Sequence, residues 1–158
     1  MMSSIIPPTP LTDDAFAFVV RNAPLVAIDI IIRDPGGDIL VGLRTNEPAR
    51  NTFYVPGGCI RKNETVHRAF DRILTTETGL TASFDSAKLL GVYEHFYETN
   101  RFNDPRYGTH YVILAYEVTL NSRQEVTTDS QHSEVRWMSK EEMRLARDVH
   151  RNTKAYVL

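Results

Sequence analysis

The segment from Leu25 to Arg33 is the feature that most limits how this chain can fold. It is rich in β-branched residues and is almost entirely apolar. Runs of this kind form strands that are buried on both faces. Asp29 interrupts the run, and a carboxylate among aliphatic side chains needs either a partner or a functional site. We therefore expect a central strand with Asp29 in a structural ion pair or at a site.

Further strands are predicted on either side of this one. Asp34-Pro35-Gly36-Gly37 is typical of a tight turn, which makes the next strand the second arm of a hairpin. A polar loop at 98–108 separates two long apolar stretches, and another short stretch follows near the C-terminus. The predicted strands are Ile39–Leu43, Thr52–Val55, Lys88–Tyr97, Thr109–Leu120 and Val135–Met138.

Three helices are predicted from their capping residues. Thr12, followed by two aspartates, begins the first helix, which Pro24 ends. Asn63 caps a helix over Glu64–Thr78, and Gly79 stops it in the left-handed conformation. Ser139 with Glu142 forms a capping box for a final helical region. Because helices and strands do not alternate regularly, the pattern favours an α+β sandwich over a doubly wound sheet.

The composition limits the classes of partner. The chain has 158 residues, of which 42% are hydrophobic, so we expect a flexible arm at 1–11 and one domain at 12–158. A net charge of −2 gives no general attraction for nucleic acid or an anionic membrane. No apolar stretch approaches the roughly 18 residues of a membrane span. The single cysteine, Cys59, cannot form an intrachain disulfide, and a cytoplasmic location is expected.

One motif carries most of the functional information. Gly57 and Gly58 follow a predicted strand, and Gly58 to Glu64 and Glu64 to Arg72 have the spacing of the Nudix box, as do Glu77, Gly79 and Leu80. Taken singly, these residues would be a turn and an ordinary solvated helix face. Together they resemble the Nudix family, although Ile73 and Thr76 stand where the family pattern has glutamates.

The altered box, together with other segments, is similar to GDP-mannose mannosyl hydrolases. That resemblance implies an α/β/α sandwich with a mixed sheet and a homodimer. It also implies hydrolysis of GDP-mannose, with GDP-glucose as a further substrate, by water attack at the anomeric carbon with inversion. The matching segments include Arg72–Leu80, Pro24–Val26, Arg44–Asn46, Val55–Gly58, His95–Tyr97, Thr109–Val112, Gln131–His132 and Val149–His150.

The same resemblance assigns roles to individual residues. His132 would be the general base, a role that suits histidine because its pKa lies near neutrality. One Mg²⁺ per subunit would be held by Glu77, Gln131 and the Gly57 carbonyl, with substrate and water oxygens completing its shell. Arg44 and Arg72 would bind the diphosphate, and Asp29 would be an assisting carboxylate. Tyr111, His95 and Phe16 would contact the substrate.

Cys59 is a departure from that family, which has an arginine directly after the two glycines. A thiol cannot supply the missing positive charge. If the segment is extended, Arg61 lies on the same side two residues later and can partly replace the arginine. Nothing nearby in the sequence would lower the pKa of Cys59, so we do not expect it to be a nucleophile.

Two other functions remain open. A Nudix pyrophosphohydrolase would attack phosphorus, but Ile73 and Thr76 leave few carboxylates to hold metals for that reaction. A nucleotide-sugar binding protein would have lost catalysis with the arginine at Cys59. Retention of Glu77, Gln131 and His132 together favours the hydrolase that attacks carbon.

Overall fold

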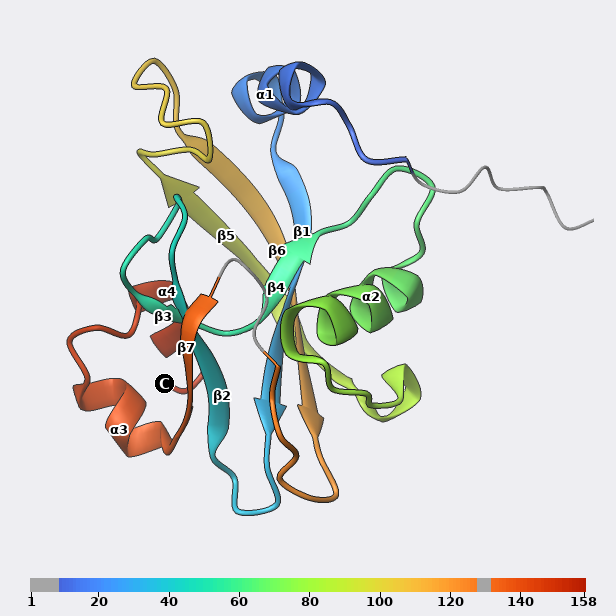
Figure 1. Cartoon of the computed structure of the whole chain (residues 1–158), viewed down its shortest axis with the longest axis vertical. Coiled ribbons are helices and arrows are strands. Elements are labelled where there is room, and N and C mark those ends of the chain that lie inside the picture. The colour runs from blue at the N-terminus through green and yellow to red at the C-terminus, as the bar shows by residue number, and fades with distance from the viewer. Residues whose placement is uncertain (1–8, 128–131) are drawn as a thin grey trace, which may run out of the picture.

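The central element is strand β1, Leu25–Arg33, as the sequence predicts. The structure, a computed structural model, describes residues 9–127 and 132–158 (Figure 1). β1 runs parallel to β6, Thr109–Thr119, and β6 runs antiparallel to β5, Lys88–Tyr97. On its other side β1 pairs antiparallel with β4, Gly57–Cys59, and with β2, Ile39–Arg44. β2 in turn pairs with β3, Phe53–Tyr54, and β7, His132–Met138.

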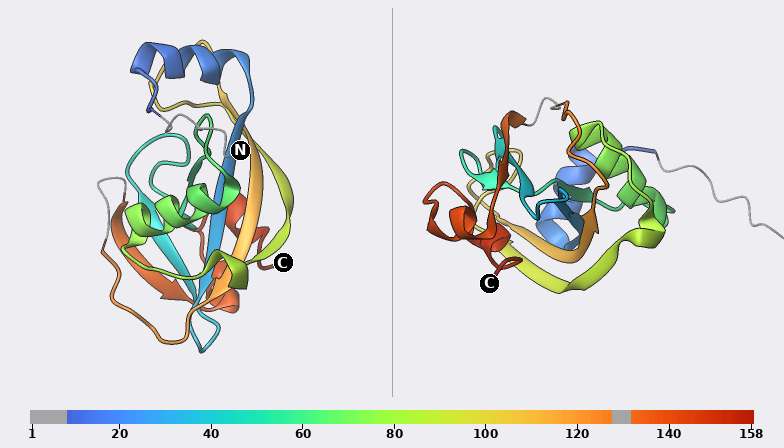
Figure 2. Two further views of the ribbon diagram at one scale, coloured as in Figure 1. Left: turned by 90° about the vertical axis from the view of Figure 1, so that its right-hand side faces the viewer. Right: turned by 90° about the horizontal axis from the view of Figure 1, so that it is seen from below.

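Helices cover both faces of this mixed sheet. In Figure 1, α2, Val66–Thr78, lies on one side, and α3, Lys140–Leu145, and α4, Arg151–Lys154, lie on the other. Figure 2 shows the sheet between these two layers from two further directions. Helix α1, Asp13–Asn22, lies beyond the end of the sheet, beside the loop that joins β5 to β6. The predicted α+β sandwich is confirmed.

Two hydrophobic cores explain why β1 is apolar throughout. Successive side chains of a strand point to opposite faces of the sheet. Ile28, Ile30 and Ile32 therefore pack with the buried side of α2, whereas Ile31 belongs to the core with Met143 of α3. Asp29 shares the face of Ile31, so its carboxylate lies in the interior on the α3–α4 side of the sheet.

Several predicted helix ends are confirmed. The hydroxyl of Thr12 accepts a hydrogen bond from the backbone N–H of Ala15, and Gly79 ends α2 with φ of 69°. Ser139 and Glu142 form the predicted capping box. None of the described helices combines the length and apolarity needed to cross a membrane.

Some element boundaries differ from the prediction. Helix α2 begins after Thr65, whose hydroxyl accepts from the N–H of Arg68, so Asn63 is not its cap. Asn63 instead has φ of 64° in the preceding loop. Gly57–Cys59 forms β4 rather than a turn. β7 begins at His132, three residues before the predicted Val135, because β2 continues to pair with it across a bulge between Gly42 and Arg44.

Candidate active site

Gly57 lies opposite Asp29 in the pairing of β4 with β1. The N–H of Ile30 donates to the Pro56 carbonyl at 2.8 Å, and that of Ile60 donates to the Val26 carbonyl at 2.9 Å. In an antiparallel pair the hydrogen-bonded positions alternate, so Gly57 occupies a non-hydrogen-bonded position. Its carbonyl is therefore directed away from β1.

The same pairing explains why residue 57 is glycine. A side chain there would clash with Oδ1 of Asp29 and would lie 2.9 Å from the carbonyl oxygen of Ile28. Non-hydrogen-bonded pairs bring opposed side chains especially close. The Asp29 carboxylate thus occupies the space directly above Gly57.

Glu77 and His132 form a buried pair between α2 and β7. Oε2 of Glu77 lies 3.6 Å from Nδ1 of His132, and both side chains are almost completely buried. This is an ion-pair distance, longer than a hydrogen bond. A Cβ at Gly42 on β2 would lie 2.6 Å from Cδ2 of His132, so a glycine is needed there to make room for the ring. The candidate base and the candidate metal carboxylate are therefore neighbours.

The two altered positions of the box do not contribute carboxylates. Ile73 is buried, and a Cβ at Gly58 would lie 3.3 Å from its Cγ1, so this side chain packs α2 against β4. Thr76 is exposed. The described residues contain no cluster of three or more His, Cys, Asp or Glu side chains arranged to hold a metal.

This donor set fits a single Mg²⁺ better than several ions. Mg²⁺ is commonly bound by one or two carboxylates, with water and phosphate oxygens filling its other positions. Glu77 supplies a buried carboxylate, and the Gly57 carbonyl is turned away from its strand partner. Gln131, the third predicted ligand, lies outside the described residues.

Arg72 has protein partners that the sequence analysis did not assign to it. Its Nε and Nη2 donate to the two carboxylate oxygens of Glu64 at 2.7 and 2.8 Å, and Nη2 also donates to the Cys59 carbonyl at 2.9 Å. The hydrogen bonds from the Arg72 guanidinium are the main reason that the pKa of Glu64 lies below its ordinary value. Arg72 therefore ties α2 to the loop before it, and its predicted contact with diphosphate remains a prediction. The box spacing, which includes both Glu64 and Arg72, was the sequence feature that could have indicated this ion pair.

Asp29 is held by a residue that the sequence analysis missed. The hydroxyl of Tyr156, near the C-terminus, donates to Oδ2 of Asp29 at 2.5 Å. Burial raises the pKa of Asp29 to about 7, and the Tyr156 hydrogen bond and the nearby Arg44 guanidinium oppose this effect. Asp29 is thus bound to a tyrosine rather than placed in an ion pair of hydrogen-bonding distance. No local sequence pattern around Tyr156 indicates this contact.

His95 lies in the interior beside the same tyrosine. Its Nδ1 is 3.0 Å from the hydroxyl of Tyr54, and its Nε2 is 3.5 Å from that of Tyr156. Burial, followed by the nearby His150, lowers the pKa of His95 to about 4, so the ring is neutral. Both ring nitrogens of His95 face protein hydroxyls, and its predicted contact with substrate remains a prediction.

Arg44 and Tyr111 face the region of Asp29. Nε of Arg44 donates to the Pro48 carbonyl at 3.0 Å, and its guanidinium lies 6.0 Å from the centre of the Tyr54 ring. Tyr111 is half-buried on β6, and burial raises the pKa of its hydroxyl. Arg44 is close enough to favour the ionised forms of both Asp29 and Tyr111. The structure therefore brings these three predicted residues into one region.

The structure also places three further residues that the sequence singled out: Phe16, Arg61 and Cys59. Phe16 on α1 packs against Phe102 of the β5–β6 loop, with ring centres 6.0 Å apart. Arg61 is exposed, and its backbone N–H donates to Glu64 at 2.9 Å. Burial raises the pKa of Cys59 to about 11. This keeps Cys59 a neutral thiol near pH 7, as expected for a residue that is not a nucleophile.

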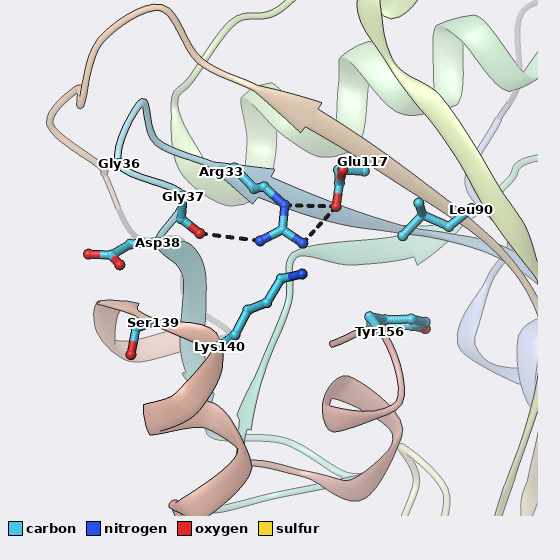
Figure 3. Close-up of a pocket in the computed structure, with 9 residues that line it drawn as sticks. All are labelled: Arg33, Gly36, Gly37, Asp38, Leu90, Glu117, Ser139, Lys140 and Tyr156. Carbon is cyan, nitrogen blue, oxygen red and sulfur yellow. Dashed lines mark hydrogen bonds and ion pairs between the residues drawn. The ribbon is translucent and has the colours of Figure 1, made fainter. Parts of the chain in front are cut away.

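A cavity of about 640 Å³ lies outside this group of residues. Figure 3 shows it between the β1–β2 turn, β6 and the start of α3. Neither Glu77 nor His132 lines it, and Tyr156 is its one connection to the Asp29 region. The candidate active site is therefore defined by its side chains and not by this cavity. The lining residues are Arg33, Gly36, Gly37, Asp38, Leu90, Glu117, Ser139, Lys140 and Tyr156.

Comparison with known proteins decides the family. The NUDIX domain profile matches residues 23–158, which is most of the chain. The chain belongs to the Nudix family. It is a Nudix hydrolase by this relationship, and hydrolases of the family generally use divalent metals such as Mg²⁺.

Individual Nudix relatives differ in what their names describe. The low-salt glycan biosynthesis protein Agl8 of Haloferax volcanii is 41% identical over 130 residues, covering 82% of this chain and 80% of that protein. An ADP-ribose pyrophosphatase of Methanocaldococcus jannaschii is 43% identical over 70 residues, covering 44% of this chain and 40% of that protein. A MutT protein from Methanosarcina mazei has the same fold, with a TM-score of 0.69, 16% identity and coverage of 86% and 92%.

Proposed function

We propose that this Nudix hydrolase splits GDP-mannose into GDP and free mannose by water attack at the anomeric carbon, with GDP-glucose as a second substrate. The observation that carries the proposal is the buried pair of Glu77 and His132 in a box that has Ile73 and Thr76 in place of two glutamates. A metal near Glu77 then has few protein charges, whereas His132 offers a separate base. The relationship to a protein named for glycan biosynthesis supports a nucleotide-sugar substrate.

In the proposed reaction His132 takes a proton from the attacking water. The water oxygen forms a bond to the anomeric carbon as the bond from that carbon to the diphosphate oxygen breaks, and GDP leaves with the electron pair. Arg44 stabilises the charge that develops on the departing diphosphate. Mg²⁺, when bound by Glu77 and the Gly57 carbonyl, would neutralise further charge on the leaving group.

The second candidate function is attack at phosphorus. It is favoured by the similarity of 70 residues to a protein named ADP-ribose pyrophosphatase. That reaction would convert GDP-mannose into GMP and mannose 1-phosphate. The replacement of two box carboxylates by Ile73 and Thr76 argues against it, because the described residues hold no multi-carboxylate metal cluster. The third candidate, a nucleotide-sugar binding protein without catalysis, would give no products at all.

Hydrolysis in heavy-oxygen water tests the proposal. The purified protein, Mg²⁺ and GDP-mannose should give unlabelled GDP and labelled mannose, with the β anomer formed first from the α-linked substrate. Free mannose incubated in the same water for the same time corrects for exchange of its anomeric oxygen. Label in a phosphate group, or GMP among the products, would overturn the proposal and support attack at phosphorus.

A further inference from the structure

Tyr156 connects the C-terminal segment to the candidate active site. Its ring lines the cavity in Figure 3, whereas its hydroxyl turns away from Lys140 and Arg33. That hydroxyl donates to Oδ2 of Asp29, 127 positions earlier in the chain. The ring is buried and packs edge-on against Tyr93, with ring centres 4.9 Å apart. Tyr156 is thus fixed on one side by packing and on the other by Asp29.

The C-terminal segment has its own anchors. The Nη2 and Nε groups of Arg144 on α3 donate to the Val157 carbonyl at 2.9 and 3.3 Å. The backbone N–H of Tyr156 donates to the Thr153 carbonyl at 3.2 Å. Because the backbone is held on both sides of the ring, the hydroxyl is presented at a defined place. Ordered groups of this kind can orient a second residue without touching the substrate.

The two carboxylate oxygens of Asp29 have different surroundings. Oδ2 accepts from Tyr156, and Oδ1 lies above the Cα of Gly57. The terminal torsion of an aspartate has broad preferences, so the side chain alone would not fix the plane of this carboxylate. The hydrogen bond from Tyr156 does so. It therefore sets the orientation of the carboxylate over Gly57, whose carbonyl is directed away from β1.

We propose that Tyr156 is a positioning residue that holds the Asp29 carboxylate over Gly57, so that the C-terminal segment completes the active site. This inference rests on the proposed function for its effect on turnover, but its geometric part is independent of the substrate. The alternative partner of the hydroxyl, Nε2 of His95, lies 3.5 Å away and is the weaker contact.

Tyr156→Phe tests the proposal because it removes the hydroxyl and keeps the ring. We expect kcat with GDP-mannose to fall about 10–100-fold, the usual effect of losing a partner that orients a functional group, while KM changes less than about threefold. Tyr93→Phe is the matched control, since it makes the same chemical change in the ring that packs against Tyr156. It should keep kcat within about twofold of the wild type. A Tyr156→Phe variant with wild-type kcat would overturn the proposal.

A double-mutant cycle with Asp29→Asn separates positioning from a general structural effect. If Tyr156 acts through Asp29, Tyr156→Phe should change kcat little when the carboxylate is already absent. An equal loss of kcat in both backgrounds would overturn the inference.

A crystal structure of Tyr156→Phe distinguishes this inference from the proposed function. The Asp29 carboxylate should rotate from its place over Gly57, and an unchanged carboxylate would contradict the positioning role. If the wild-type protein turns over neither GDP-mannose nor GDP-glucose, the proposed function fails. The crystal structure of the variant then still decides whether Tyr156 holds Asp29.

Discussion

At the scale of single residues, the exchange of box glutamates for Ile73 and Thr76 changes what the site can do. Ile73 packs against Gly58 and therefore contributes to stability rather than to metal binding. Glu77 keeps a buried carboxylate, and His132 lies 3.6 Å from it. A site of this kind can bind a diphosphate through one metal ion while a separate base serves the water.

His132→Ala should lower kcat by about 10²–10⁴-fold and leave KM within a fewfold of the wild type, because a general base acts in the transition state. Steady-state kinetics with GDP-mannose measure both constants. The control is His67→Ala, which changes an exposed histidine of α2 that pairs with Asp71 on the surface. Near-full turnover by His132→Ala would eliminate this histidine as the base.

Cys59 and Arg61 give a second prediction at this scale. We expect Cys59→Arg to raise kcat/KM about tenfold, the effect of one added charged hydrogen bond to phosphate. Arg61→Ala should lower kcat/KM more in the wild-type background than in the Cys59→Arg background, because the new arginine would then carry the contact. Kinetics of the two single variants and the double variant measure the coupling. Strict additivity would contradict a shared role.

At the scale of secondary-structure elements, the position of α2 depends on the loop that follows β4. Glu64 lies in this loop, and its almost fully buried carboxylate bridges Arg72 of α2 and the backbone N–H of Arg61. Arg72 also reaches the Cys59 carbonyl on β4. The pair therefore fixes the strand, the loop and the helix that carry Gly57 and Glu77.

Glu64→Gln should destabilise the protein by about 1–3 kcal/mol at pH 7, because hydrogen bonds to charged groups contribute this much. Arg72 lowers the folded-state pKa of Glu64 below its unfolded value. The stabilisation is therefore fully present above the unfolded pKa of about 4.3 and is lost as pH falls through the folded pKa. Thermal unfolding of both proteins from pH 3 to pH 8 measures the difference. A difference that stays constant across this range would rule out the ionised pair as its cause.

Local sequence patterns predicted most elements because their causes are local. The apolar run Leu25–Arg33, the cap at Thr12 and the left-handed Gly79 each depend on neighbouring residues. The predicted start of α2 was wrong because Asn63 and Thr65 are both good capping residues, and it is Thr65 whose hydroxyl accepts from the N–H of Arg68.

The site was predictable only where a motif already linked distant positions. The box spacing brings Gly57 and Glu77 into consideration together, and family resemblance adds His132. Tyr156 was missed, since a hydrogen bond across 127 positions leaves no periodicity and no characteristic spacing. The enclosure of His95 was also missed, because it depends on tyrosines contributed by β3 and the C-terminal segment.

At the scale of the whole molecule, one face of the sheet carries exposed apolar side chains beyond the end of α2. The strand register places Val26 of β1 on the same face as Val92 and Phe96 of β5, with the exposed Glu94 between the last two. The exposed fractions of the three apolar residues are 47%, 61% and 60%. Among the described strands only β6 pairs with β5. The other edge of β5 therefore has backbone N–H and C=O groups that no described strand pairs with. Exposed apolar surface beside an open sheet edge favours association.

We propose that a second copy of the chain covers this face, since a twofold axis lets one patch bind the same patch on its partner. The mass in solution should then be twice the 18.0 kDa of one chain. Val92→Glu should shift the protein toward the monomer at micromolar concentration, because it places a charge in the apolar contact. Light scattering coupled to size-exclusion chromatography measures the mass. Phe18→Glu is the control, because Phe18 is 69% exposed but lies on α1 and not on the sheet. A monomeric wild-type protein would contradict the dimer, whereas a dimer that survives Val92→Glu would place the interface on another surface.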